Sequence, residues 1–308
     1  MRFSISIPQL GDTEFDGAGL QSYLRRAEDL GFEGGWTVEQ TVGPGPMIAP
    51  MELLAYAAAC TERLRLGVAV LITSLHDPLQ LASIATAVDR LSHGRLDLGV
   101  APGGGFRQFD AFGVDRSTFI ASFTEGLDLM KAAWSDEPAV TFHGRFRTVD
   151  DVTVTPKPVQ RPHPPLWFGG HAPKALARAV RLGDAFMGAG SSTVADFVEV
   201  AAGVRRELDA QDKDPALFTV AKRVYLIVDD DAARARERVV AGLNRIYGPR
   251  PDNAAIAVSG TSAQVADVVA QVIDAGAQMV LLHPVGAGVA EDREQLEQLA
   301  AEVIPQLR

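Results

Sequence analysis

The stretch 164-PPLWFGGHAPKALARAVRLGDAF-186 contains the unit that decides the fold. A short apolar run at 166–170 ends in two glycines, and Pro173 opens an Ala-rich segment behind it. The apolar residues of that segment have the spacing of an amphipathic helix, which Gly183 closes before a second apolar run begins at Ala185. The pattern therefore predicts a strand, a helix and a second strand in quick succession.

The same unit recurs along the chain. Apolar, β-branched runs begin near residues 2, 35, 64, 95, 166, 185, 218 and 278, and helical patterns separate most of them. Eight such strands in about 300 residues favour a closed (β/α)8 barrel, the TIM barrel. The alternative is an open doubly wound sheet, but its Gly-x-Gly-x-x-Gly fingerprint follows none of the strands. We expect one barrel domain over residues 1–308.

An interruption separates the fourth predicted strand from the fifth. Residues 116–134 have the pattern of a long helix, and the segment at about 136–163 has short alternating runs and a Pro-rich tail. That pattern predicts a small hairpin followed by an extended connection, inserted into the barrel.

Composition limits the function classes. Of the 308 residues, 47% are hydrophobic and 22% charged, which is typical of a soluble globular protein, and the net charge of -10 argues against nucleic acid as a partner. No apolar run approaches the roughly 20 residues that span a membrane. The N-terminus has the pattern of a strand rather than a signal peptide, and the single Cys60 forms no internal disulfide. A cytoplasmic protein is expected, and no metal-binding motif is present.

Glycines and small residues follow three consecutive strands, the fourth to the sixth. Functional sites of such barrels lie at the carboxyl ends of the strands, where glycine lets a ligand approach the backbone and a helix start offers free N–H groups to an anion. Tight turns between strand and helix are the alternative explanation of the glycines. We predict a phosphate-bearing ligand at these positions: Gly103, Gly169, Gly170, His171, Ala189, Gly190 and Ser191.

Two longer stretches resemble the luciferase-like monooxygenase superfamily. They are LRLGVAV at 64–70 with DPLQLASIATAVDRLSHGRLDLGVAPGG at 77–104, and PHPPLWFGGHAPKALARAVRLGDAF at 162–186. The resemblance covers nearly the whole chain, including the inserted hairpin. It implies a (β/α)8 barrel that binds FMN or the deazaflavin coenzyme F420.

The resemblance also implies roles for individual residues. A non-prolyl cis peptide on the third strand would support the cofactor ring, and the matching residues are Ala69 and Val70. The cofactor phosphate would lie on the glycines at 169–170. Substrate would enter near the ends of the second and last strands, where the matching residues are Trp36, Glu39, Gln40 and His283. For Trp36, packing inside the barrel remains an equal alternative, and His283 could be catalytic or merely line the pocket.

The chain departs from one branch of that superfamily. The deazaflavin-dependent sugar-phosphate dehydrogenases carry Asp-His behind the second strand, whereas this chain has Glu39-Gln40, and glutamine has no group that titrates near neutral pH. The branch also has a glutamate in the loop that here begins at Gly103. Sugar-phosphate oxidation by that mechanism is therefore not expected. No catalytic residue is assigned, and His76-Asp77 is interpreted as structural.

The leading hypothesis is an oxidoreductase that uses reduced F420 or FMN to transfer hydride to, or oxygenate, a small organic substrate. F420 is preferred because the Ala-, Arg- and Gly-rich composition resembles that of high-GC actinobacterial proteins. With FMN, a separate reductase could supply reduced cofactor. A neutral or apolar substrate is expected, since no basic substrate pocket is evident, and family members commonly form homodimers.

Two rival hypotheses remain. One is a sugar-phosphate lyase or isomerase on the same barrel, although a Schiff-base enzyme needs a lysine at a strand end and Lys222 lies in mid-strand. The other is a non-catalytic flavin-binding protein.

Overall fold

Eight parallel strands close into a barrel in the computed structural model, which describes residues 1–9, 15–43, 45–103 and 106–307. Each strand pairs with the next, and the last pairs with the first, Arg2 opposite Met279. The predicted TIM barrel is confirmed. In order, the strands are β1 (Arg2–Ser6), β2 (Gly34–Thr37), β3 (Arg65–Ile72), β4 (Leu96–Ala101), β7 (Leu166–Phe168), β8 (Ala185–Gly188), β9 (Thr219–Val228) and β11 (Met279–Pro284).

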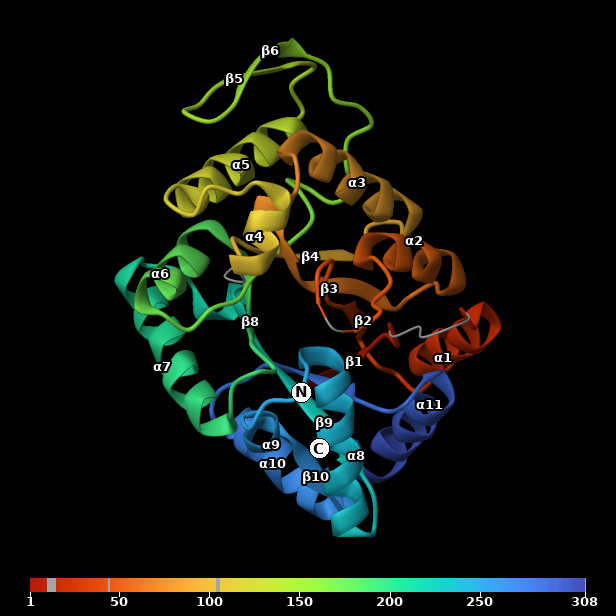
Figure 1. The fold of residues 1–308 in the computed structure, drawn as a ribbon. Helices are drawn as coiled ribbons and strands as arrows, with labels where there is room; N and C mark the ends of the chain where they lie inside the picture. The colour runs from red at the N-terminus through yellow and green to blue at the C-terminus, as the bar shows by residue number, and fades with distance from the viewer. Residues whose placement is uncertain (10–14, 44, 104–105, 308) are drawn as a thin grey trace.

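Helices form a ring around the barrel (Figure 1). Several begin as their sequences predict: Asp77 accepts hydrogen bonds from the first-turn N–H groups of Leu79 and Gln80, and Thr193 forms a capping box with Asp196. The main helices are α1 (Gly17–Asp29), α2 (Pro50–Cys60), α3 (Pro78–Leu91), α5 (Phe119–Trp134), α6 (Pro173–Leu182), α7 (Val194–Ala210), α8 (Ala232–Tyr247), α10 (Ser262–Asp274) and α11 (Val289–Gln298).

Three short elements were not expected from the sequence. They are α4 (Phe106–Phe112), α9 (Asn253–Ile256) and β10 (Val258–Gly260), which pairs with the end of β9. The inserted hairpin was expected: β5 (Val140–His143) pairs antiparallel with β6 (Thr148–Val152), and it lies beyond α5 at the periphery (Figure 1). The insertion therefore leaves the barrel strands uninterrupted.

Aromatic side chains fill the amino-terminal half of the barrel. Trp36 packs edge-on against Trp167, with ring centroids 5.0 Å apart, and a Cβ on Gly67 would lie only 2.3 Å from the Trp36 ring. The indole of Trp167 donates to Asp97, which also pairs with Arg65 at 2.7 Å. These side chains occupy the barrel interior below the carboxyl ends of the strands.

Strand β3 carries a bulge near that end. Its register against β4 shifts between Val68 and Leu71, and the peptide bond between Ala69 and Val70 is cis, as the resemblance implies. Gly99 of β4 lies opposite, where a Cβ would be 2.0 Å from the Val68 carbonyl oxygen. The bulge therefore requires a glycine at position 99.

Candidate functional site

One cavity of about 350 Å³ opens at the carboxyl ends of β3, β4, β7, β8 and β9. Its lining includes every residue that the sequence suggested for cofactor binding, from four separate segments of the chain. These residues are Ala69, Val70, Gly103, Gly169, Gly170, His171, Ala189, Gly190 and Ser191. The structure thus brings the predicted ring support and the predicted phosphate site into one space.

The phosphate end of the cavity is formed by Gly170 and the start of α6. Gly170 has a φ of +141°, and a Cβ there would lie 2.9 Å from the Ala175 side chain, so only glycine fits without strain. No side chain caps α6 at Ala172. Pro173 has no N–H and the Ala175 N–H donates to the Ala172 oxygen at 2.8 Å, so the Lys174 N–H is the first-turn group left for a ligand. Arg178 lines the same cavity, and burial lowers the pKa of its guanidinium, with Arg181 adding to the shift. This end suits an anion.

Lys222 fixes the loop behind β8. Its ammonium donates to the backbone oxygen of Ser192 at 2.7 Å, to the hydroxyl of Ser192 at 2.9 Å and to the backbone oxygen of Ala189. Burial lowers the pKa of Lys222 to about 7, and the charge of Asp196 opposes that shift. Lys222 supports the loop from behind and does not line the cavity, so the structure offers no support for a Schiff-base role.

The other end of the cavity is formed by the β3 bulge and Arg223. Ala221 belongs to the cluster inside the barrel, and Arg223, two residues later on β9, faces the same way. The guanidinium donates to the Ala69 carbonyl oxygen at 2.6 Å. Its Nε is buried and has no hydrogen-bond partner among the described residues. Arg223 is only 6% exposed and lines the cavity.

A pair of tyrosines adjoins this end. Tyr247, the last residue of α8, lines the cavity, and its hydroxyl lies 2.6 Å from that of Tyr225. Burial raises the pKa of Tyr247 well above its ordinary value, and Tyr225 adds to the shift. The phenol is therefore protonated at neutral pH and available as a hydrogen-bond donor.

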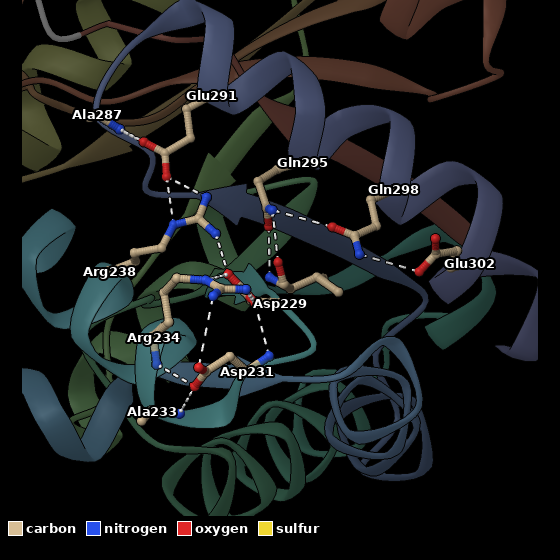
Figure 2. Close-up of polar contacts among 11 residues, drawn as sticks. Asp229, Asp231, Ala233, Arg234, Arg238, Ala287, Glu291, Gln295, Gln298 and Glu302 are labelled. Atoms are coloured by element: carbon tan, nitrogen blue, oxygen red, sulfur yellow. Dashed lines mark hydrogen bonds and ion pairs between the residues drawn. The ribbon is translucent and has the colours of Figure 1, made fainter.

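An ion-pair network secures the helix that carries Tyr247 (Figure 2). Asp229, just behind β9, accepts hydrogen bonds from Arg234 and Arg238 of α8, and the contact with Arg234 holds the pKa of Asp229 well below its usual range. Arg238 also pairs with Glu291 of α11. The network ties α8 to both β9 and α11 at the cavity's end of the barrel.

The four predicted substrate residues do not line the cavity. Trp36 does not belong to this pocket and instead packs inside the barrel: it is 2% exposed and borders a different cavity, at the amino-terminal end, with Arg65 and Asp97. His283 borders a small cavity of about 30 Å³ with Gln9 and Asp292. Burial and the charge of Arg223 lower the pKa of His283 well below its ordinary value, so its ring is neutral.

Glu39 and Gln40 lie behind β2, and Glu39 has a partner that was not anticipated. Its carboxylate lies 2.6 Å from Nε2 of His76 and accepts a hydrogen bond from the Ile72 N–H at 2.5 Å. The hydrogen bond to Glu39 raises the pKa of His76. The amide nitrogen of Gln40 is buried without a partner among the described residues. The partner of His76 is thus Glu39, whereas Asp77 caps α3.

Three cavity residues with charged or hydroxyl-bearing side chains were missed in the sequence: Arg178, Arg223 and Tyr247. The expectation of a pocket without basic groups is wrong, because two guanidinium groups line the space. A signal existed for Arg223, since a charged residue in the middle of an otherwise apolar strand, FTVAKRVYLIV at 218–228, requires a polar partner. The other two lie on helices, where the sequence does not show which side chains reach the strand ends.

A comparison with known protein families shows which family this chain belongs to. The model described as luciferase-like monooxygenase matches residues 1–254. The chain belongs to this family. Family members are oxidoreductases and monooxygenases that use a flavin-type cofactor, either a flavin or F420. The match spans the strands of the barrel from β1 to β9 and the whole lining of the described cavity.

Individual relatives match over shorter stretches. An uncharacterized protein of Sinorhizobium fredii is 32% identical over 158 residues, 51% of this chain and 45% of that protein. An uncharacterized protein of Mycobacterium tuberculosis is 37% identical over 120 residues, 39% of this chain and 42% of the relative. The oxygenase component of the flavin-dependent trigonelline monooxygenase of Acinetobacter baylyi is 28% identical over 155 residues, 48% of this chain and 41% of that protein. The chain thus matches less than half the length of these relatives.

Solved structures share the fold over the full chain. Monooxygenase RslO1 from Streptomyces bottropensis superposes with a TM-score of 0.85 at 24% identity, and F420-dependent tetrahydromethanopterin reductase from Methanopyrus kandleri with 0.81 at 20% identity, each covering 100% of both chains. At these identities the likeness shows the barrel alone. Within the described residues, no helix has the length and apolar character needed to cross a membrane.

Proposed function

We propose that this chain is an oxidoreductase that binds reduced F420, or alternatively FMN, in the 350 Å³ cavity and transfers hydride to a small organic substrate. One observation carries the proposal. Residues predicted for two separate tasks, ring support at Ala69–Val70 and phosphate binding at Gly169–Gly170, line the same cavity.

The residues present fit such a cofactor. The phosphate end combines a glycine that no larger residue can replace, an uncapped helix start and the guanidinium of Arg178. Between the two ends the lining is largely apolar, with Ile120 and Met187 among its larger side chains, which suits a flat ring. When bound, the cofactor would supply the hydride or, as a reduced flavin, activate oxygen.

The chain's own groups would bind and orient the substrate and donate a proton to it. Hydride transfer to a carbonyl leaves an alkoxide that must gain a proton. None of the described residues that line the cavity is Asp or Glu, but the protonated Tyr247 phenol is present. We assign Tyr247 as the donor, with Tyr225 holding its hydroxyl in place at 2.6 Å.

Two observations support F420 and a reductive reaction. The composition is of the kind found in organisms that make the deazaflavin. A phthiodiolone/phenolphthiodiolone dimycocerosates ketoreductase of Mycobacterium sp. is 26% identical over 205 residues, 66% of this chain and 54% of that protein. The FMN alternative, with a separate reductase and oxygenation of the substrate, is supported by the similarity to the oxygenase component of trigonelline monooxygenase.

The experiment is a single-turnover test under anaerobic and aerobic conditions. The protein is mixed with reduced F420 or reduced FMN and a panel of ketones, and the absorbance of the oxidised cofactor is followed. The proposal expects anaerobic oxidation of F420 that depends on the ketone and slows at least about tenfold in Tyr247→Phe. Formation of an oxygenated product only with FMN and oxygen would favour the oxygenase, and no turnover with either cofactor would refute the proposal.

A further inference from the structure

Arg223 is a buried cation that has no counterion among the described residues. It is 6% exposed, and it forms no ion pair in the part of the chain that the structure describes. Of its five N–H groups, one donates to the Ala69 carbonyl oxygen, and Nε is buried with no acceptor. An unpaired buried charge is costly, and protein interiors tolerate one where a ligand completes its shell. The unmet donors of Arg223 belong to a side chain that lines the cavity.

The tyrosine pair offers a further donor in the same place. Two hydroxyls carry two hydrogens, and one of these is used in the 2.6 Å bond between Tyr225 and Tyr247. The second hydrogen has no acceptor among the described residues, and Tyr247 borders the cavity together with Arg223. This end of the cavity therefore presents several donors and a positive charge, with no carboxylate in its described lining to balance them.

We propose that Arg223 binds a carboxylate of the substrate, so that the substrate is a small organic acid whose reacting carbonyl lies beside Tyr247. The inference rests on the proposed function and narrows it to a substrate class. A carboxylate is planar and offers two oxygens, which matches the fork of a guanidinium, and the Tyr247 phenol is left to donate its proton at the reacting carbonyl. The expectation of a neutral substrate, drawn from the sequence, is thereby replaced.

The cofactor phosphate does not account for Arg223. We place that phosphate at Gly170, Arg178 and the start of α6, whereas Arg223 lies beside Gly190, where an added Cβ would be 2.9 Å from the Arg223 Cδ. Arg223 lies on β9 and is bonded to the β3 bulge. Burial and the charge of Arg223 lower the pKa of His283, so its ring is neutral and adds no positive charge to the site.

The test compares acids with their amides, which have nearly the same shape and no charge. Benzoate, phenylacetate and hexanoate, each with its amide, are titrated by calorimetry into the cofactor-loaded protein. We expect at least one acid to bind at least about tenfold more tightly than its amide. Arg223→Met should weaken that acid about 10- to 100-fold, with the amides nearly unaffected.

A second variant keeps the test decisive if Arg223→Met does not fold. Arg223→Lys retains the charge and a donor for the Ala69 oxygen but loses the planar fork, and it should weaken the acid about tenfold. Equal binding of acids and amides, no acid binding at all, or unchanged acid affinity in these variants would overturn the inference. So would a loss of cofactor affinity in Arg223→Met as large as the loss of acid affinity, because Arg223 would then serve the cofactor.

The two proposals fail in different ways. The dissociation constant of the cofactor is measured first, without any acid. Cofactor binding together with an absence of acid binding would overturn the carboxylate site and leave the proposed function standing. Acid binding by a protein that takes neither F420 nor FMN would refute the proposed function, while the charge preference at Arg223 would be retained.

Discussion

Replacement of Gly99 by alanine is expected to damage both the fold and the cofactor site. A Cβ at this position would lie 2.0 Å from the Val68 carbonyl oxygen and 3.2 Å from the Ala69 Cα. Carbon and oxygen atoms ordinarily approach to about 3.3 Å, so β3 and β4 would have to separate by more than about 1 Å. Overpacking of this kind costs about 1–3 kcal/mol of stability. The displaced segment includes Ala69, which lines the cavity.

Urea unfolding and cofactor titration measure the two effects separately. We expect Gly99→Ala to lose about 1–3 kcal/mol in the free energy of unfolding and to raise the cofactor dissociation constant at least about tenfold. Gly288→Ala is the matched control, because Gly288 has extended backbone and no atom within 4 Å of an added Cβ. A Gly99→Ala protein with the stability and affinity of the control would refute the role given to the bulge.

Three further predictions concern buried polar groups. The pKa of His76 is raised in the folded protein, so its pair with Glu39 stabilises the fold below about pH 6.5, by no more than about 1 kcal/mol. This contribution is lost as the pH rises through the folded pKa of His76. The free energy of unfolding of Glu39→Gln, measured in urea, should lack this pH dependence. Burial raises the pKa of Asp292 to about 7, so the free energy of unfolding of the wild type should fall between about pH 4 and pH 7. Asp292→Asn should lack this fall and should be on the order of 1–2 kcal/mol more stable than the wild type at pH 8. Lys222→Met removes three bonds to the loop behind β8 and should weaken cofactor binding about tenfold in a titration, and unchanged affinity would contradict the role given to that loop.

The barrel could be predicted because its signals are local. Each strand is a short apolar run, and each helix follows with its own cap or proline, so the alternation is visible without tertiary information. The glycine-rich strand ends were informative for the same reason. In a parallel barrel all carboxyl ends of strands meet at one face, and positions directly behind a strand, such as Gly170 and Gly190, must lie there.

The rest of the site was not predicted, because it depends on how deep a side chain lies in the barrel and on contacts between segments far apart in the sequence. Trp36 lies within a strand and not behind it, and its side chain fills the packed half of the barrel. Tyr247 reaches the cavity from the far end of a helix of 16 residues, and only packing decides which of its side chains does so. The Glu39–His76 contact joins loops behind neighbouring strands, which strand order alone could have suggested.

The central claim is that the cavity between Ala69 and Gly170 holds a flavin-type cofactor. Paired fluorescence titrations of the purified protein, one with F420 and one with FMN, test it most directly. The account predicts saturable binding of F420 that is tighter than that of FMN, and a loss of affinity of at least about tenfold in Gly170→Ala, whose added methyl group would meet Ala175. Binding of neither cofactor, or equal binding by wild type and Gly170→Ala, would contradict the account.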